Sequence, residues 1–342
     1  MCVAQRRLVR LAPDDRIGNY CVERELGSTR TGALYQAVHA VLPRRAVLKV
    51  TQLAAFATQV LREACILEAL RHPGAPQVYE SGLLPERLPW FAVEAIEGLT
   101  LVERLAQGPL TALEVAQLVR DIAIVLEHAH RRGVVHRGLR PDRIVLTPRR
   151  RFPICIPDWS DARTHDAAHR IPHIASRESQ QYIAPELLRG DTVDDRADIF
   201  ALGVIAYLAL TGKHPFTSLT SGRMPTSEAA PDAPPELAAM IDQMLSVDRY
   251  DRPSAAELRA DLDWLAAALT SDAAPVAPIE DIELVDTDGV PAGIGPVTAT
   301  VPQLPSLPRI RRPRWTPPYA QIAAEDDSDY AEIEVEEPTP AS

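Results

Sequence analysis

Apolar residues in the first hundred positions occur in short runs separated by Gly, Pro and pairs of Arg. Such runs, bounded by turn-forming residues, are typical of β-strands joined by hairpins, and the sequence has four, at residues 19–26, 33–39, 46–51 and 91–95. Residues 54–70 instead repeat apolar positions at the spacing of one helix face, until His72-Pro73-Gly74 ends the pattern. The pattern predicts a strand-rich first lobe with one helix.

From residue 99 onward the pattern becomes helical. Residues 197–211 are almost entirely apolar. Because about 20 residues are needed to span a bilayer, this stretch predicts the central helix of a helical lobe rather than a membrane span. Amphipathic runs predict three further helices, at residues 112–132, 235–245 and 254–269.

Helical periodicity disappears after Thr270. Residues 271–342 contain 12 prolines and carry 14 acidic and 4 basic side chains. A segment of this composition cannot bury enough apolar surface to fold, so we expect a disordered, Pro-rich acidic tail over residues 269–342. Its basic residues at 309–314 are expected to be solvated or paired with the tail's own carboxylates, whereas Trp315 and the Pro-Pro-Tyr at 317–319 are suited to docking a protein partner.

Charge and cysteine content exclude several classes of function. The net charge of −11 lies mainly in the tail, since the other 33 acidic and 32 basic residues nearly cancel. The globular part therefore shows no basic face for nucleic acid. The four cysteines have no paired spacing, which argues against disulfides or a zinc site. With no apolar segment behind the N-terminal arginines, we expect a cytoplasmic protein.

Residues 134–145, Val-Val-His-Arg-Gly-Leu-Arg-Pro-Asp-Arg-Ile-Val, resemble the catalytic loop of protein kinases, His-Arg-Asp-Leu-x-x-x-x-Asn. His136 and Arg137 match the family pattern. Gly138 stands where the family has its proton-accepting Asp, Arg143 where it has a metal-holding Asn, and Arg140 where it has a Lys near the γ-phosphate. A positioned general base contributes about 10²–10⁴ in rate, so phosphoryl transfer at ordinary rates is not expected.

Two alternatives remain open for this loop. Arg143 can pair with Asp158 and exclude magnesium, or it can lie against a phosphate in place of one magnesium ion. An acid from elsewhere, such as Asp142 or Asp161, delivered to position 138 beside a divalent ion would restore the missing chemistry.

Further motifs extend the resemblance to the nucleotide side of the site. Gly27 and Gly32 match the first and third glycines of the Gly-rich loop, with Thr29 at the second. Lys49 matches the phosphate-binding lysine and Glu63 its partner on the first helix. The resemblance also implies pocket or hinge positions for Val47, Glu94, Ile96 and Val145.

The metal aspartate and the scaffold motifs are present as well. Asp158-Trp159-Ser160 stands where the family has Asp-Phe-Gly, which makes Asp158 the implied, though weakened, magnesium ligand. The resemblance implies that Glu186 forms a buried ion pair with Arg252, and that Asp198 holds the catalytic-loop backbone around His136 and Arg137.

The chain is therefore similar to bacterial Hanks-type serine/threonine kinases over residues 15–268. We expect an α+β, two-lobed protein-kinase-like fold: an N-terminal extension at 1–14, a small β-rich lobe at 15–97, a larger helical lobe at 98–268, and the tail.

The favoured function is a pseudokinase with weak or no phosphoryl transfer. It would act as a signalling scaffold or allosteric regulator that retains ATP binding and binds protein partners through the helical lobe and tail. The alternatives are an active serine/threonine kinase with a non-standard loop, and a pure interaction module with a closed nucleotide pocket.

Overall fold

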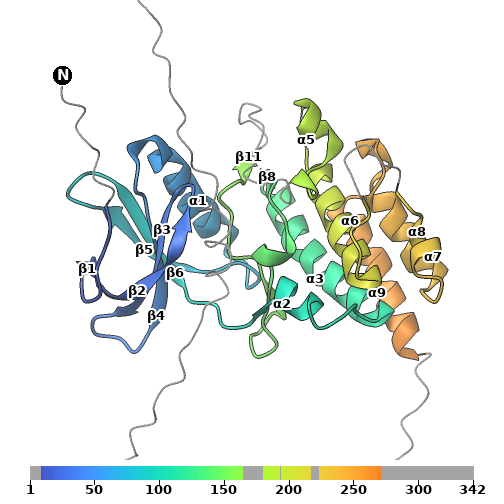
Figure 1. The fold of residues 1–342 in the computed structure, drawn as a ribbon, viewed down its shortest axis with the longest axis horizontal. Helices are drawn as coiled ribbons and strands as arrows, with labels where there is room; N and C mark the ends of the chain where they lie inside the picture. Colours follow the sequence, from blue (N-terminus) through green and yellow to red (C-terminus); the bar gives the residue numbers. More distant parts are fainter. Residues whose placement is uncertain (1–8, 165–179, 193, 217–222, 272–342) are drawn as a thin grey trace, which may run out of the picture.

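The computed structural model describes residues 9–164, 180–192, 194–216 and 223–271. Within these ranges the chain forms two lobes side by side, one built on a curled β-sheet and the other on helices (Figure 1). The predicted two-lobed α+β architecture is confirmed. The predicted tail lies outside the described residues from Asp272 onward, as do residues 1–8 of the predicted N-terminal extension.

The sheet of the first lobe has six antiparallel strands in the order β1-β2-β3-β4-β6-β5. The helix α1 (Ala57–Leu70) follows a short 3-10 turn, η1 (Ala54–Phe56), and contacts β5 and β6. The strands are β1 (Arg16–Ile17), β2 (Tyr20–Thr29), β3 (Gly32–His39), β4 (Arg45–Val50), β5 (Val78–Leu83) and β6 (Pro89–Glu94).

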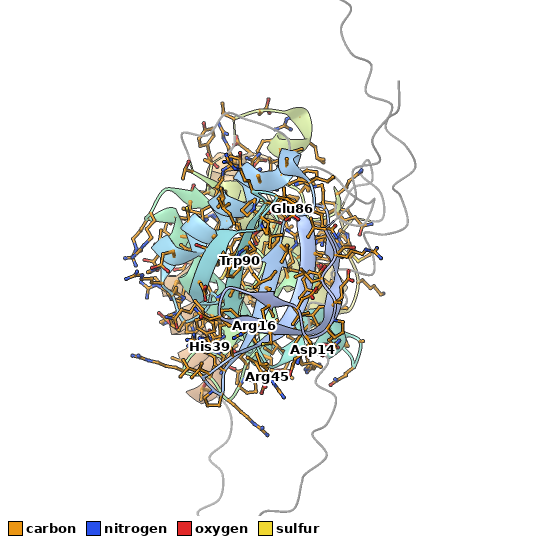
Figure 2. All side chains as sticks on the ribbon, turned by 90° about the vertical axis from the view of Figure 1, so that its left-hand side faces the viewer. Asp14, Arg16, His39, Arg45, Glu86 and Trp90 are labelled. Carbon is orange, nitrogen blue, oxygen red and sulfur yellow. The ribbon has the colours of Figure 1, made fainter. Side chains whose placement is uncertain are left out.

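Alternation along the strands gives this sheet two apolar faces. In β4, Val47 belongs to the large core that the sheet shares with α1 and the helical lobe, whereas Leu48 and Val50 belong to a smaller cluster on the outer face. Trp90 of the outer cluster is labelled in Figure 2, which views this lobe end on. Because side chains two apart on a strand share a face, Lys49 lies on the side of Val47, facing the other lobe.

The helical lobe is arranged around α6 (Arg196–Thr211), of which 12 of 16 residues are buried. A helix buried on nearly all sides has no polar face, which explains why its sequence is almost entirely apolar after Asp198. Among the described residues, no helix has both the length and the apolarity that crossing a membrane requires. The other helices are α2 (Leu101–Leu105), α3 (Ala112–His130), α5 (Pro185–Arg189), α7 (Thr226–Ala229), α8 (Pro235–Met244) and α9 (Ala255–Ser271).

Short strands between the lobes position the catalytic loop. β8 (Val134–Val135) precedes the loop and pairs with β11 (Arg163–Thr164), so the loop lies beside residues 158–164. The loop itself contains the 3-10 turn η2 (Pro141–Arg143). A three-stranded sheet lies behind it, formed by β7 (Leu99–Thr100), β9 (Val145–Leu146) and β10 (Ile154–Cys155).

The elements differ from the sequence-based expectations in several places. The residues expected to open the first helix form η1 instead, and α9 continues to Ser271, beyond the expected start of the tail at 269. The edge strand β5 was not predicted, because none of its residues is buried and its sequence shows no regular alternation of apolar and polar positions. Tyr79 interrupts its pairing with β6 as a bulge, and a bulge shifts the facing of side chains along a strand.

A buried ion pair joins α5 to the segment before α9. Arg252 donates two hydrogen bonds to the Glu186 carboxylate, at 2.7 and 2.9 Å, and a third to the Ser246 carbonyl at 2.8 Å. The side chain of Arg252 is fully buried. The structure thus brings together two residues that lie 66 positions apart in the sequence.

Replacing Arg252 by Met should strongly destabilise the fold, because Glu186 would remain buried without a cation. We expect a loss of about 3–5 kcal/mol in the free energy of unfolding, measured by urea denaturation. Arg189→Met is the matched control, since Arg189 pairs with Asp191 at the surface and such pairs contribute about 0–1 kcal/mol. Equal losses in the two variants would contradict the prediction.

Candidate functional site

Asp198 at the start of α6 fixes the backbone of the catalytic loop. Its carboxylate accepts hydrogen bonds from the backbone N–H groups of His136 at 2.8 Å and Arg137 at 2.7 Å, and lies 2.9 Å from Nε2 of His130. Arg137 is held at a φ of +64°, a left-handed conformation that non-glycine residues seldom adopt. Burial alone would raise the pKa of the Asp198 carboxyl. The contact with His130 and the hydrogen bonds from the loop N–H groups outweigh this effect and lower the pKa below its ordinary value.

Arg143 lies over the backbone of position 138. Its Nη1 is 3.2 Å from the Gly138 carbonyl oxygen and 2.9 Å from Oδ2 of Asp161, while its Nε is 3.0 Å from Oδ2 of Asp158. A Cβ at position 138 would lie 2.4 Å from this Nη1 and 2.9 Å from the Asp161 carboxylate. The guanidinium in this position therefore fills space that a side chain at residue 138 would otherwise use, and such a side chain would shift it.

The Arg143 contacts belong to a row of alternating positive and negative side chains that crosses the site. Lys49 is 2.7 Å from Glu63 and 4.0 Å from Asp158. Asp158 contacts Arg143, and Arg143 contacts Asp161. At the far end, Arg30, at the tip of the β2–β3 turn, lies 3.7 Å from Asp161. Three cations and three carboxylates thus join both lobes.

Neighbouring side chains in this row stabilise each other's charged forms. Burial alone would raise the pKa of Asp158, but the guanidinium of Arg143 and the ammonium of Lys49 hold it well below its usual range. Burial likewise opposes the charge of Arg143, and the carboxylates of Asp158 and Asp161 outweigh that effect and raise its pKa. Both side chains are therefore ionised at neutral pH.

The contact of Arg143 with Asp158 corresponds to the first of the two arrangements considered from the sequence. The sequence also raised the possibility that Asp142 or Asp161 reaches position 138 beside a divalent ion. Asp161 does approach position 138, but the cation beside it is the guanidinium of Arg143. Asp142 instead accepts a hydrogen bond from Arg140 at 2.7 Å. Sequence reasoning missed Arg30, whose only signal was a basic residue at the tip of the Gly-rich turn.

The space beneath the Gly-rich turn is small. The cavity has a volume of about 30 Å³ and is lined by Thr29, Leu34, Val47, Lys49, Glu63, Phe91, Val93, Pro157 and Asp158. Sites for drug-sized ligands have volumes of about 300–1,000 Å³. Within the described residues, no cluster of three or more His, Cys, Asp or Glu side chains could hold a metal ion. A cavity of this size does not accommodate ATP with the side chains in this arrangement, and the place beside Asp158 where the family holds magnesium is taken by the guanidinium of Arg143.

Both matched glycines of the turn have structural reasons to be there. A Cβ on Gly32 would lie 2.2 Å from the carbonyl oxygen of Val50 in β4, so close packing of β3 against β4 requires glycine. Gly27 has a φ of +151° next to a bulge in β2, a conformation that favours glycine. Their presence is thus explained without a bound phosphate.

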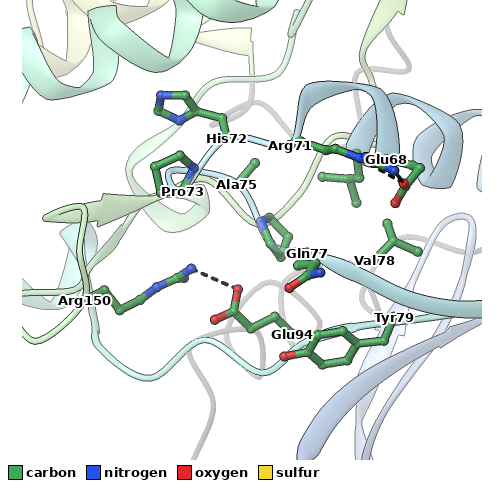
Figure 3. A pocket seen from close by; sticks show the side chains of 12 residues that line it. Glu68, Arg71, His72, Pro73, Ala75, Gln77, Val78, Tyr79, Glu94 and Arg150 are labelled. Atoms are coloured by element: carbon green, nitrogen blue, oxygen red, sulfur yellow. Dashed lines mark hydrogen bonds and ion pairs between the residues drawn. The ribbon is translucent and has the colours of Figure 1, made fainter.

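The implied hinge and floor residues do not line this cavity. Ile96 and Val145 are fully buried in the main core. The Glu94 carboxylate accepts a hydrogen bond from Arg150 at 2.9 Å. This pair lies in a larger hollow of about 770 Å³, at the end of α1 and outside the nucleotide cavity (Figure 3). His72, Pro73 and Tyr79 are among its other walls.

The aromatic residue of the Asp-Trp-Ser motif packs between the lobes. Trp159 is fully buried, and its ring centroid lies 4.6 Å from that of His136 in an edge-to-face arrangement. The indole N–H donates to the Ile156 carbonyl at 2.8 Å. Gln59 of α1 donates to the Ser160 carbonyl at 3.0 Å, which ties the first helix to this motif.

A sheet-based lobe, a helical lobe and a buried lysine–glutamate pair facing an aspartate across the junction define a protein-kinase fold. The chain belongs to the protein kinase domain family, which it matches over residues 20–264.

Serine/threonine kinases of bacteria are among its relatives. The chain is 30% identical over 262 residues to serine/threonine-protein kinase pkn3 of Myxococcus xanthus, covering 70% of this chain and 48% of that protein. It is 30% identical over 224 residues to PknB of Mycolicibacterium smegmatis, covering 60% and 36%. The chain thus spans less than half the length of these curated relatives.

The fold is also similar to that of a solved kinase structure. The autoinhibited serine kinase domain of the giant muscle protein titin matches with a TM-score of 0.62 at 22% identity, covering 73% of this chain and 81% of that one. At this level of identity the likeness concerns the fold alone.

Glu63 should give the fold an unusual pH dependence. Burial raises its pKa from 4.5 to about 7, and the Asp158 charge adds to this while Lys49 opposes it. Between these two values the folded chain holds a proton that the unfolded chain has released, so this contribution to stability falls as the pH rises through the window. Glu63→Gln should remove that part of the slope.

The measurement is the free energy of unfolding by urea at intervals from pH 4.5 to 8. Glu68→Gln is the control, because Glu68 lies on the same helix but pairs with Arg71 at the surface. An identical slope in wild type and Glu63→Gln would show that Glu63 does not titrate in this way.

Proposed function

We propose that this chain is a pseudokinase, a kinase-fold scaffold or allosteric regulator that does not transfer phosphate at ordinary rates. The observation that carries the proposal is the guanidinium of Arg143, which lies between Asp158 and Asp161 against a position 138 that has no side chain. In the family, that region needs a free carboxylate at 158 for magnesium and a carboxylate at 138 for the substrate hydroxyl.

The retained framework supports the regulatory part of the proposal. The Lys49–Glu63, Asp198–loop and Glu186–Arg252 contacts remain formed. A scaffold that persists without its catalytic groups presents a stable surface to partners. We propose that protein partners bind the helical lobe and the segment 269–342, and that the closed cavity makes the folded state independent of nucleotide.

A phosphoryl-transfer assay tests the proposal. We expect wild type to incorporate no radiolabel from ATP into itself or a generic acceptor protein, with magnesium or manganese. Because positions 138 and 143 do not line the closed cavity, the double variant Gly138→Asp/Arg143→Asn should also incorporate none while that cavity excludes ATP; incorporation by the double variant would show that these two loop residues alone were missing. Adding Lys49→Ala to the double variant controls for contaminating kinases, and wild-type incorporation abolished by Lys49→Ala would contradict the proposal.

An ATP titration tests whether the cavity is closed. A ligand that binds only the folded state raises the unfolding temperature, so we expect no shift of the midpoint up to millimolar ATP, with magnesium or with EDTA. A rising midpoint in wild type that Lys49→Ala abolishes would instead support a pseudokinase regulated by nucleotide.

One observation favours a second candidate, an active serine/threonine kinase with a non-standard loop. The Asp161 carboxylate lies 2.9 Å from where a Cβ at 138 would be, close to where the family places its acid. In that case Asp161→Asn should abolish radiolabel incorporation and Asp142→Asn should leave it, because Asp142 is paired with Arg140.

A further inference from the structure

The oxygen atoms around Arg143 form a cage of a particular kind. One carboxylate oxygen comes from Asp158, one from Asp161, and a backbone carbonyl oxygen comes from Gly138. Carboxylate and carbonyl oxygens are the ligands that hard divalent cations prefer. In this chain the group among them is a guanidinium.

The cage requires a cation. The Asp158 and Asp161 side chains are only 11% and 15% exposed, and a buried carboxylate without a partner is strongly destabilising. Arginine stays charged at any accessible pH and offers several N–H donors in a fixed plane. Because Arg143 is part of the chain, it occupies the cage without the entropy loss that binding a free ion requires.

Gly138 controls access to the cage. Any residue with a Cβ there would place that atom 2.4 Å from Nη1 of Arg143. The guanidinium would then have to shift from its place beside Asp161, so we expect positions 138 and 143 to be coupled.

The neighbouring cation of the same loop does not share this role. Arg140 immediately precedes η2 and donates a hydrogen bond to Asp142, which is not one of the cage carboxylates. It therefore provides a matched control for the loss of one positive charge from the loop.

We propose that Asp158, Asp161 and the Gly138 carbonyl form a cation site whose resident is Arg143, that this guanidinium excludes divalent cations, and that removing it converts the cage into a divalent-cation site. The proposal concerns the same site as the proposed function. It can fail while phosphoryl transfer remains absent, because its test measures metal binding and stability.

The test compares the full chain with its Arg143→Asn and Arg140→Asn variants. Manganese binding is counted by electron paramagnetic resonance, and thermal unfolding is recorded in EDTA and in increasing Mn²⁺. Wild type and Arg140→Asn should bind no Mn²⁺ and keep their midpoints. Arg143→Asn should unfold at a lower temperature in EDTA, bind one Mn²⁺, and recover with Mn²⁺, since ligand at a hundred times Kd raises the folded-to-unfolded ratio about a hundredfold.

Several outcomes would overturn the proposal. One is a wild-type chain that binds Mn²⁺ as Arg143→Asn does; another is an Arg143→Asn chain that binds none. If Arg143→Asn does not fold in EDTA, refolding in Mn²⁺ supports replacement of the guanidinium by a divalent cation, and failure to refold in Mn²⁺ contradicts it.

A double-mutant cycle tests the role of Gly138 separately. Gly138→Ala should lower the folded-to-unfolded ratio about tenfold or more in wild type, as overpacking of a filled site commonly does. In the Arg143→Asn background, measured in Mn²⁺, it should cost less because the nearer contact, with Nη1, is gone, while the contact with Asp161 at 2.9 Å is present in both backgrounds. An equal cost in both backgrounds would show that the two positions are not coupled.

Discussion

The structure of this site depends on one constraint: two nearly buried carboxylates, Asp158 and Asp161, need a positive partner, and the chain supplies its own. Arg143 lies within 3.0 Å of both. The other ion pairs extend from this point, through Lys49 to α1 and through Arg30 to the Gly-rich turn. The junction between the lobes is therefore neutralised internally, and the remaining cavity has a volume of only about 30 Å³.

The framework around this junction keeps its usual supports. Asp198 holds the strained backbone at Arg137, and Trp159 packs against His136 between the lobes. These contacts depend on burial and backbone hydrogen bonds, so they survive changes in the residues that face a substrate. A fold can therefore remain stable while the chemistry of its cleft changes.

Much of the fold was predictable from the sequence, because periodicity and motif order report the local environment. Lys49 and Glu63 could be placed together from their motifs, and Glu186 with Arg252 likewise. Arg30 could not, since its contact with Asp161 joins residues 131 positions apart across a turn whose geometry the sequence does not reveal. The sequence suggested a closed nucleotide pocket only as one alternative, because the size of the cavity depends on how Thr29, Leu34 and Val47 pack together.

The guanidinium of Arg143 and the bare backbone at residue 138 share one small volume. A side chain at 138 and an arginine at 143 compete for that space, so a change at either position alters what the other can hold. Without the arginine, Asp158 would keep Lys49 and Asp161 would keep Arg30, each at a longer distance than Arg143. The two positions therefore act as one unit, and neither residue describes the loop by itself.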